Sequence, residues 1–230
     1  MITFDEFKIF KFPSVGSTND EAFEILKSTG LHPIAVVADE QSKGRGRSGH
    51  SWLSQPGGLY LSIGIPSGDL LTDSKLIVFT SLPVVEILRE FGIKAHIKIP
   101  NDVYVGGKKI AGILGERKSG FLVIGIGLNV NQKSFPKSLN ATSMLIETGE
   151  IHDKNELLYS LLQKFRDLLQ DTNLAYHRWV SHVNVIGKNV RFIYKGKEVK
   201  GTVRTVDRNL NLVLNNGKFN IYEIFEFREL

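Results

Sequence analysis

A segment rich in glycine and arginine is the part of this sequence most suited to chemistry. It spans Gly44–Trp52, reads GRGRSGHSW and contains no acidic residue. Its glycines let the backbone approach a ligand, and the guanidinium groups of Arg45 and Arg47 suit carboxylate or phosphate oxygens. A solvated basic loop or an Arg-Gly tether for nucleic acid has a similar composition. The position between two apolar segments, and the Trp at its end, favour an ordered loop over a pocket.

A second cluster follows an alternating segment. Residues 93–99 place apolar side chains on one face and Lys94, His96 and Lys98 on the other, which predicts a strand ended by Pro100. An ammonium group at a strand end suits a phosphate or an acyl group that gains charge during reaction. The following Asn-Asp pair could hold Mg²⁺, but it is equally common in turns, so the cluster alone leaves both interpretations open.

Two further features are compatible with a ligand site. Ser17, Thr18 and Asn19 precede a helical pattern, where they could cap the helix or bind a small polar ligand. Gly125 and Gly127 lie in an apolar strand pattern, where they could leave space for a flat ligand or allow a close strand–helix contact.

Composition excludes several kinds of site. The 230 residues include no cysteine, which rules out disulfides, thiol nucleophiles and Cys-ligated metals. The histidines show no paired metal-binding spacing, and no nucleophile-elbow motif is present. The net charge of +5 permits nucleic-acid binding but is also typical of a site for one anionic ligand. No signal peptide or membrane span is recognisable, so we expect a soluble, cytoplasmic protein.

The apolar periodicity predicts an α+β domain over residues 1–184 and a small β domain over 185–230. The first region has predicted strands at 4–12 (ended by Pro13), 34–38, 59–65, 93–99 and 121–130, and a hairpin over 103–117. Its first predicted helix starts within Ser17–Glu21, with a Thr18–Glu21 capping box, and runs up to Gly30. The other predicted helices cover 73–91 (kinked or restarted at Pro83), 153–169 and 174–182. The second region has predicted strands at 190–194, 199–206, 210–214 and 219–224.

The order and spacing of these motifs resemble those of biotin protein ligases, that is, biotin–[acetyl-CoA-carboxylase] ligases. The matching segments are Ser-Thr-Asn, Gln41 with GRGRSGHSW, Lys-Ile-Pro-Asn-Asp, GKKIAGIL from residue 107 and Gly-Ile-Gly-Leu-Asn. The chain departs from the family pattern at Ile99, where Trp is usual, and at Ser48 and His50, which are often basic. Since the alternation places Ile99 on the buried face, we expect that change to affect packing.

The resemblance implies a class II synthetase-like catalytic domain, with a mixed sheet flanked by helices, and a C-terminal SH3-like β-barrel. It implies that biotin and Mg·ATP give biotinyl-5′-AMP and pyrophosphate, and that biotin then passes to a lysine of a biotin carboxyl carrier domain. Because the Ser-Thr-Asn motif begins at residue 17, we expect the monofunctional form, without the family's DNA-binding domain. A homodimer is the expected assembly.

The resemblance also assigns roles to residues. Lys98 and Arg47 would be catalytic, Lys98 contacting the biotin carboxylate and the α-phosphate and Arg47 retaining the adenylate. The biotin-binding residues would be Ser17, Thr18, Asn19, Gln41, Arg45, Gly46, Arg47, Trp52, Lys98, Gly112, Gly125 and Gly127. ATP or the adenylate would contact Arg45, Arg47, Lys98, Asn101 and Asn129, and Asp102 would be a candidate ligand of Mg²⁺.

Two alternatives stay open at this point. A lipoate–protein ligase shares the fold and the adenylation chemistry, although its motifs usually differ from GRGRSGHSW. A nucleic-acid-binding module would use the Arg-Gly loop and the aromatic residues of the C-terminal domain, namely Phe192, Tyr194, Phe219 and Tyr222.

Overall fold

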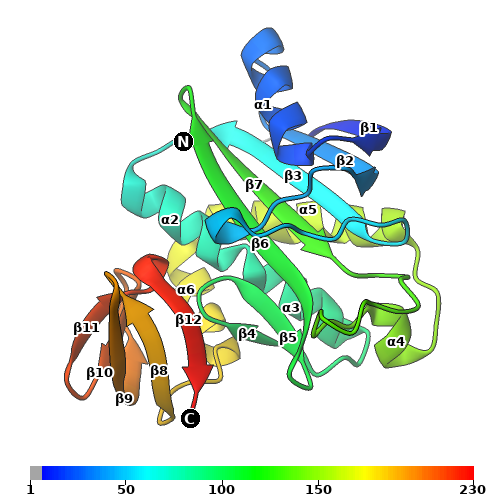
Figure 1. The fold of residues 1–230 in the computed structure, drawn as a ribbon. Coiled ribbons are helices and arrows are strands. Elements are labelled where there is room, and N and C mark those ends of the chain that lie inside the picture. The colour runs from blue at the N-terminus through cyan, green and yellow to red at the C-terminus, as the bar shows by residue number, and fades with distance from the viewer. Residues whose placement is uncertain (1–6) are drawn as a thin grey trace.

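A seven-stranded sheet forms the centre of the molecule (Figure 1), which is described over residues 7–230 by a computed structural model. Its strands lie in the order β1-β2-β3-β7-β6-β5-β4. They are β1 (Lys8–Val15), β2 (Ile34–Gln41), β3 (Leu59–Pro66), β4 (His96–Lys98), β5 (Asp102–Val105), β6 (Lys108–Lys118) and β7 (Phe121–Leu128). β1 and β2 are parallel and all other neighbours are antiparallel, so the predicted mixed sheet is confirmed.

Helices cover the two faces of this sheet unequally (Figure 1). Four of them, α2 (Leu70–Phe79), α3 (Ser81–Glu90), α5 (Lys154–Gln170) and α6 (Thr172–His182), enclose the main apolar core with the sheet. α1 (Thr18–Thr29) packs on the opposite face over β2, β3 and β7, and the short α4 (Met144–Thr148) precedes α5. The rest of that opposite face is free to carry a site.

The C-terminal region forms a second, antiparallel sheet in the order β11-β10-β9-β8-β12. Its strands are β8 (Asn189–Tyr194), β9 (Lys197–Val206), β10 (Asn211–Leu214), β11 (Gly217–Asn220) and β12 (Ile224–Glu229). This sheet is consistent with the expected small SH3-like domain, and the predicted α+β class is confirmed. The domain boundary at residues 184 and 185 stays a prediction.

Proline affects two predicted elements differently. The predicted end of the first strand at Pro13 is wrong, because β1 continues to Val15. β1 is an edge strand, where a missing N–H need not break a ladder. Residues 4–6 of that predicted strand lie outside the described residues. The predicted helix over 73–91 is two helices, and Pro83 lies in the first turn of α3, where it fits without a kink.

Three further predictions needed correction. Thr18 is not the N-cap of α1, because its hydroxyl donates to Gln41. The N-cap is Ser17, whose side chain makes no capping hydrogen bond. The strand over residues 93–99 is reduced to β4, although its alternation of buried and less buried residues holds. The strand over 219–224 is wrong, because a 3₁₀ turn, η2 (Ile221–Glu223), separates β11 from β12.

Within residues 7–230 no helix is both long and apolar enough to cross a bilayer.

The packing of α5 predicts a stability difference. Phe165 on this helix is fully buried, whereas Tyr159 on the same helix is 55% exposed. We expect Phe165→Ala to lower the free energy of unfolding by about 3–5 kcal/mol, because it removes the ring and leaves a cavity. Urea unfolding would measure this, with Tyr159→Ala as the matched control. Equal losses in the two variants would contradict the description of the core.

Candidate functional site

A cavity of about 340 Å³ lies on the face of the sheet that carries α1. Its walls come from α1, the loop after β2, the strands β4 to β7 and strand β12 of the second sheet. All predicted site residues but one line it, namely Ser17, Thr18, Asn19, Gln41, Arg45, Gly46, Arg47, Trp52, Lys98, Asn101, Asp102, Gly112, Gly125 and Gly127. Folding therefore brings residues from five separate motifs to one place.

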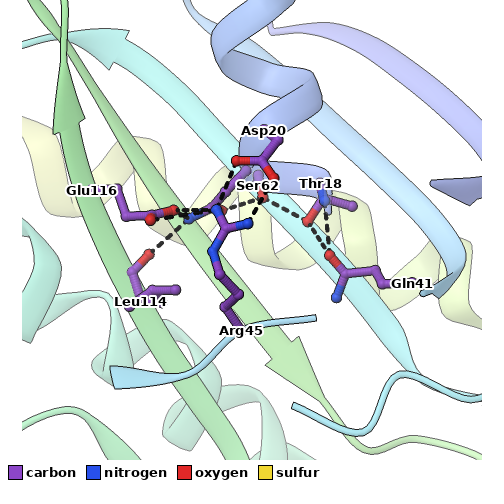
Figure 2. A network of polar contacts seen from close by, with 8 residues as sticks. Thr18, Asp20, Gln41, Arg45, Ser62, Leu114 and Glu116 are labelled. Carbon is purple, nitrogen blue, oxygen red and sulfur yellow. Dashed lines mark hydrogen bonds and ion pairs between the residues drawn. The ribbon is translucent and has the colours of Figure 1, made fainter. Parts of the chain in front are cut away.

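One end of the cavity is a network of polar side chains, shown in Figure 2. The side-chain amide oxygen of Gln41, Oε1, accepts hydrogen bonds from the backbone N–H of Thr18 at 2.8 Å and from the Thr18 hydroxyl at 3.0 Å. Ser62 Oγ lies 2.7 Å from Thr18 Oγ1 and 2.6 Å from Asn19 Oδ1. Sequence analysis missed Ser62, whose only signal is a polar residue in the middle of an apolar strand. The network fixes the orientation of the side-chain amides of Gln41 and Asn19.

Arg45 extends this network through two carboxylates (Figure 2). Its guanidinium group binds Asp20 in bidentate fashion at 2.6 and 2.7 Å and Glu116 at 3.2 Å, while Asn19 Nδ2 donates to Glu116 at 2.6 Å. The hydrogen bond from Arg45 lowers the pKa of Asp20. Both carboxylates were missed, because charged residues on an exposed helix turn and a strand end carry no particular signal. Since these ion pairs are partly exposed, Arg45 can exchange them for a ligand anion at modest cost.

The apolar wall of the cavity depends on glycine. A Cβ at Gly127 would lie 2.5 Å from the Trp52 indole, and one at Gly112 would lie 3.0 Å from it. A Cβ at Gly125 would lie 2.5 Å from Asn19 Oδ1. The close strand–helix contact is therefore present at Gly125, whereas Gly112 and Gly127 make room for the indole of Trp52. Space for a flat ligand at these glycines stays a prediction.

Two lysines line the cavity. Lys98 Nζ lies 4.5 Å from the centre of the Tyr104 ring, and burial raises the pKa of that tyrosine to about 12. Lys109 Nζ lies 2.7 Å from Asp102 and 5.2 Å from the Trp52 ring centre. Lys109 was not among the predicted site residues. The signal that could have identified it is its place in the GKKIAGIL segment, directly after the Gly-Gly turn and Lys108. Its position on β6, beside the glycine strand, makes it a second candidate for binding phosphate.

Two buried polar atoms in the cavity wall have no hydrogen-bond partner among the described residues, Trp52 Nε1 and Asn101 Oδ1. Asn101 Nδ2 is used, since it donates to the Ile113 carbonyl. Buried polar groups are normally paired, so these two atoms are available to a polar ligand. Ile99, beside Asn101, is buried as predicted.

The candidate Mg²⁺ ligand Asp102 offers one carboxylate to the cavity, and it is paired with Lys109. The part of the chain described here holds no cluster of three metal-ligating side chains. Mg²⁺ often keeps several waters and binds through one carboxylate and substrate phosphates. The residues present therefore fit a Mg²⁺ ion that arrives on nucleotide phosphates.

Asn129 lies apart from the cavity. Its side chain is buried and donates to the Thr142 carbonyl at 2.9 Å, anchoring the chain that follows β7. The proposed contact of this residue with adenine stays a prediction.

Arg47 is held differently from Arg45. Its guanidinium donates to the carbonyl of Tyr222 in η2 at 2.8 Å and lies 5.6 Å from the centre of the Phe225 ring on β12. Burial lowers the pKa of Arg47.

Comparison with known proteins agrees with this geometry. The model of the biotin/lipoate A/B protein ligase family matches residues 12–132, which include most of the cavity wall. The chain belongs to this family. The biotin/lipoate ligase match ends at Gln132, so the second sheet lies outside it.

Individual relatives cover more of the chain. The bifunctional ligase/repressor BirA of Bacillus spizizenii is 34% identical over 77% of this chain and 60% of its own length, and BirA of Salmonella typhimurium is 33% identical over 91% and 70%. The chain thus matches about 60% of the first of these relatives. A biotin protein ligase from Aquifex aeolicus, solved with biotin and ATP, superposes with a TM-score of 0.84 at 28% identity, covering 97% of this chain and 99% of that one.

The contact between Gly127 and Trp52 predicts a binding defect. In Gly127→Ala the new methyl group displaces the indole, so we expect biotin affinity to fall by roughly tenfold or more. Isothermal titration with biotin would measure this. Gly16→Ala is the matched control, because a Cβ there meets no atom within 4 Å. Unchanged affinity in Gly127→Ala would show that the indole does not form the wall of a ligand site.

Proposed function

We propose that this protein is a biotin–protein ligase that activates biotin with Mg·ATP and transfers it to a lysine of a carrier domain. The observation that carries the proposal is one cavity with a polar end at Thr18, Asn19 and Gln41, an indole wall at Trp52, and cations beside that wall. Biotin has matching parts, since a polar ureido ring and an apolar ring and chain lead to a carboxylate. The relatives described above support it.

The first step joins two anions. A biotin carboxylate oxygen attacks the α-phosphorus of ATP, a new P–O bond forms, and the bond to the β-phosphate oxygen breaks to release pyrophosphate. Fixed cations offset the repulsion and stabilise the charge that builds up on the phosphorus oxygens. Lys98, Lys109 and Arg47 all line the cavity and can serve in this way.

In the second step a neutral lysine amine of the carrier domain attacks the biotinyl carbonyl. The C–O bond to AMP breaks, AMP leaves, and the nitrogen loses a proton as the amide forms. No covalent bond to the enzyme is needed, which is compatible with a chain that contains no cysteine. The reactive mixed anhydride must meanwhile be shielded from water, and the 44–52 loop over the cavity is placed to shield it.

Three finer expectations form part of this proposal. The catalytic domain comprises residues 1–184 and an SH3-like domain 185–230. The protein works in the cytoplasm. It forms a homodimer, for which the free edge of β1 offers unpaired backbone groups to a second copy.

The proposed activity has a direct test. We expect pyrophosphate release with biotin and Mg·ATP, and biotinyl-AMP in the products by mass spectrometry. Lipoate in place of biotin is the control for the related activity of the family. Pyrophosphate release with lipoate and none with biotin would overturn the proposal. Binding of nucleic acid that falls steeply with salt, without any adenylation, would favour the nucleic-acid alternative.

The two lysines predict separable effects. We expect Lys98→Ala and Lys109→Ala each to slow adenylate formation by on the order of a hundredfold, because each removes a fixed cation beside the reacting group. Biotin affinity should fall much less in Lys98→Ala than in Lys109→Ala, since only Lys109 contacts the indole wall. Rapid-quench measurement of adenylate, with Lys188→Ala as the control for a lysine outside the cavity, would check both. A wild-type rate in Lys98→Ala would remove its catalytic role.

A further inference from the structure

Strand β12 is irregular where it faces the cavity. Between Phe225 and Arg228 its register against β8 slips by one residue, and Glu226 adopts a left-handed φ of +50°. Such a conformation is costly for a residue other than glycine, so it persists only when the surrounding structure holds it. The bulge breaks the normal alternation of side chains, and the four consecutive residues from Ile224 to Phe227 line the cavity.

The bulge lies beside Arg47. The Tyr222 carbonyl accepts a hydrogen bond from the guanidinium at 2.8 Å, and the Phe225 ring lies 5.6 Å from the guanidinium carbon. We call the Tyr222 carbonyl and the Phe225 ring the arginine platform. A planar guanidinium is well suited to this combination, because it can donate in its plane and stack over an aromatic face.

The Tyr222 part of the arginine platform is itself anchored to helix α2. The Tyr222 hydroxyl donates to the Ser74 carbonyl on α2 at 2.9 Å, and the Tyr222 N–H donates to the Asn220 side chain at 2.9 Å. Tyr222 is thus held by Ser74 on α2 and by Asn220. The other part of the platform, Phe225, lines the cavity and is 46% exposed. An exposed aromatic ring on a strained strand, next to a partly buried guanidinium, is not explained by core packing.

The two arginines of the loop are therefore held from opposite sides. Arg45 is bound by Asp20 and Glu116 on the first sheet and its helix, and Arg47 by the second sheet. We propose that Phe225 is a positioning residue that aligns Arg47 for retention of the acyl-adenylate, so that the C-terminal sheet takes part in the site. The inference rests on the proposed ligase function.

The test measures leakage of the intermediate. With biotin, Mg·ATP and no acceptor, we expect Phe225→Ala to raise free biotinyl-AMP per pyrophosphate about two- to fivefold, the loss expected for one cation–π contact. Phe225→Tyr should restore retention, because it keeps the ring. In an Arg47→Ala background, Phe225→Ala should add nothing, since its partner is already gone. Phe91→Ala is the control, because that partly exposed ring lies outside the cavity.

A second measurement needs no activity. Without ligand, trypsin cleavage of the Arg47–Ser48 bond should be faster in Phe225→Ala than in the wild type, with cleavage after Lys43 unchanged as the internal reference. Mass spectrometry of early digests identifies the bond that is cut.

The outcomes separate the two proposals. If the wild type makes no biotinyl-AMP, the ligase function fails, whatever the cleavage pattern. If the wild type is active and Phe225→Ala matches it in both leakage and cleavage, the positioning role is overturned. An equal effect of Phe225→Ala in the Arg47→Ala background would also overturn it, because the ring would then act through general stability of the second sheet.

Discussion

The site depends on the absence of side chains at three positions of the central sheet. Gly112, Gly125 and Gly127 occupy adjacent positions on β6 and β7, on the face away from the main core. Side chains there would collide with the Trp52 indole or with the Asn19 amide. Their absence lets a loop and a helix approach the sheet closely while a cavity stays open between them. The polar network and the cations are arranged around that space.

Four cationic side chains of this cavity have partners before any ligand is considered. Arg45 pairs with Asp20 and Glu116, Lys109 pairs with Asp102, and Lys98 and Arg47 lie against aromatic rings. Each of these contacts is partly exposed or weak, so an anionic ligand can replace it with little loss of stability. Because these contacts already hold the side chains, less side-chain conformational entropy is lost when a ligand binds.

Both sheets contribute residues to the cavity. α1, β6 and β7 hold the polar end and the glycine wall, while the second sheet holds Arg47 through the arginine platform. The 44–52 loop connects the two regions, because α1 and β6 bind Arg45 whereas η2 and β12 bind Arg47. Closure of the loop over a ligand would then depend on the spacing between the sheets, which the Tyr222–Ser74 hydrogen bond helps to fix.

Apolar periodicity and motif spacing are local properties, so they predicted most of the elements, the α+β class, the family and fourteen of the residues that line the cavity. Tertiary structure alone decided which partners those residues have. Thr18 bonds Gln41 instead of capping its helix, and Ser62 and Glu116 join the site from strand positions that carry no functional signal. Lys109 lies in the GKKIAGIL motif, but only the fold brings it to Asp102 and the indole. The arginine platform lies 175 residues from Arg47. The contact between Arg47 and the arginine platform depends on how the two sheets pack together. No pattern within the 44–52 loop or within residues 222–225 encodes that packing.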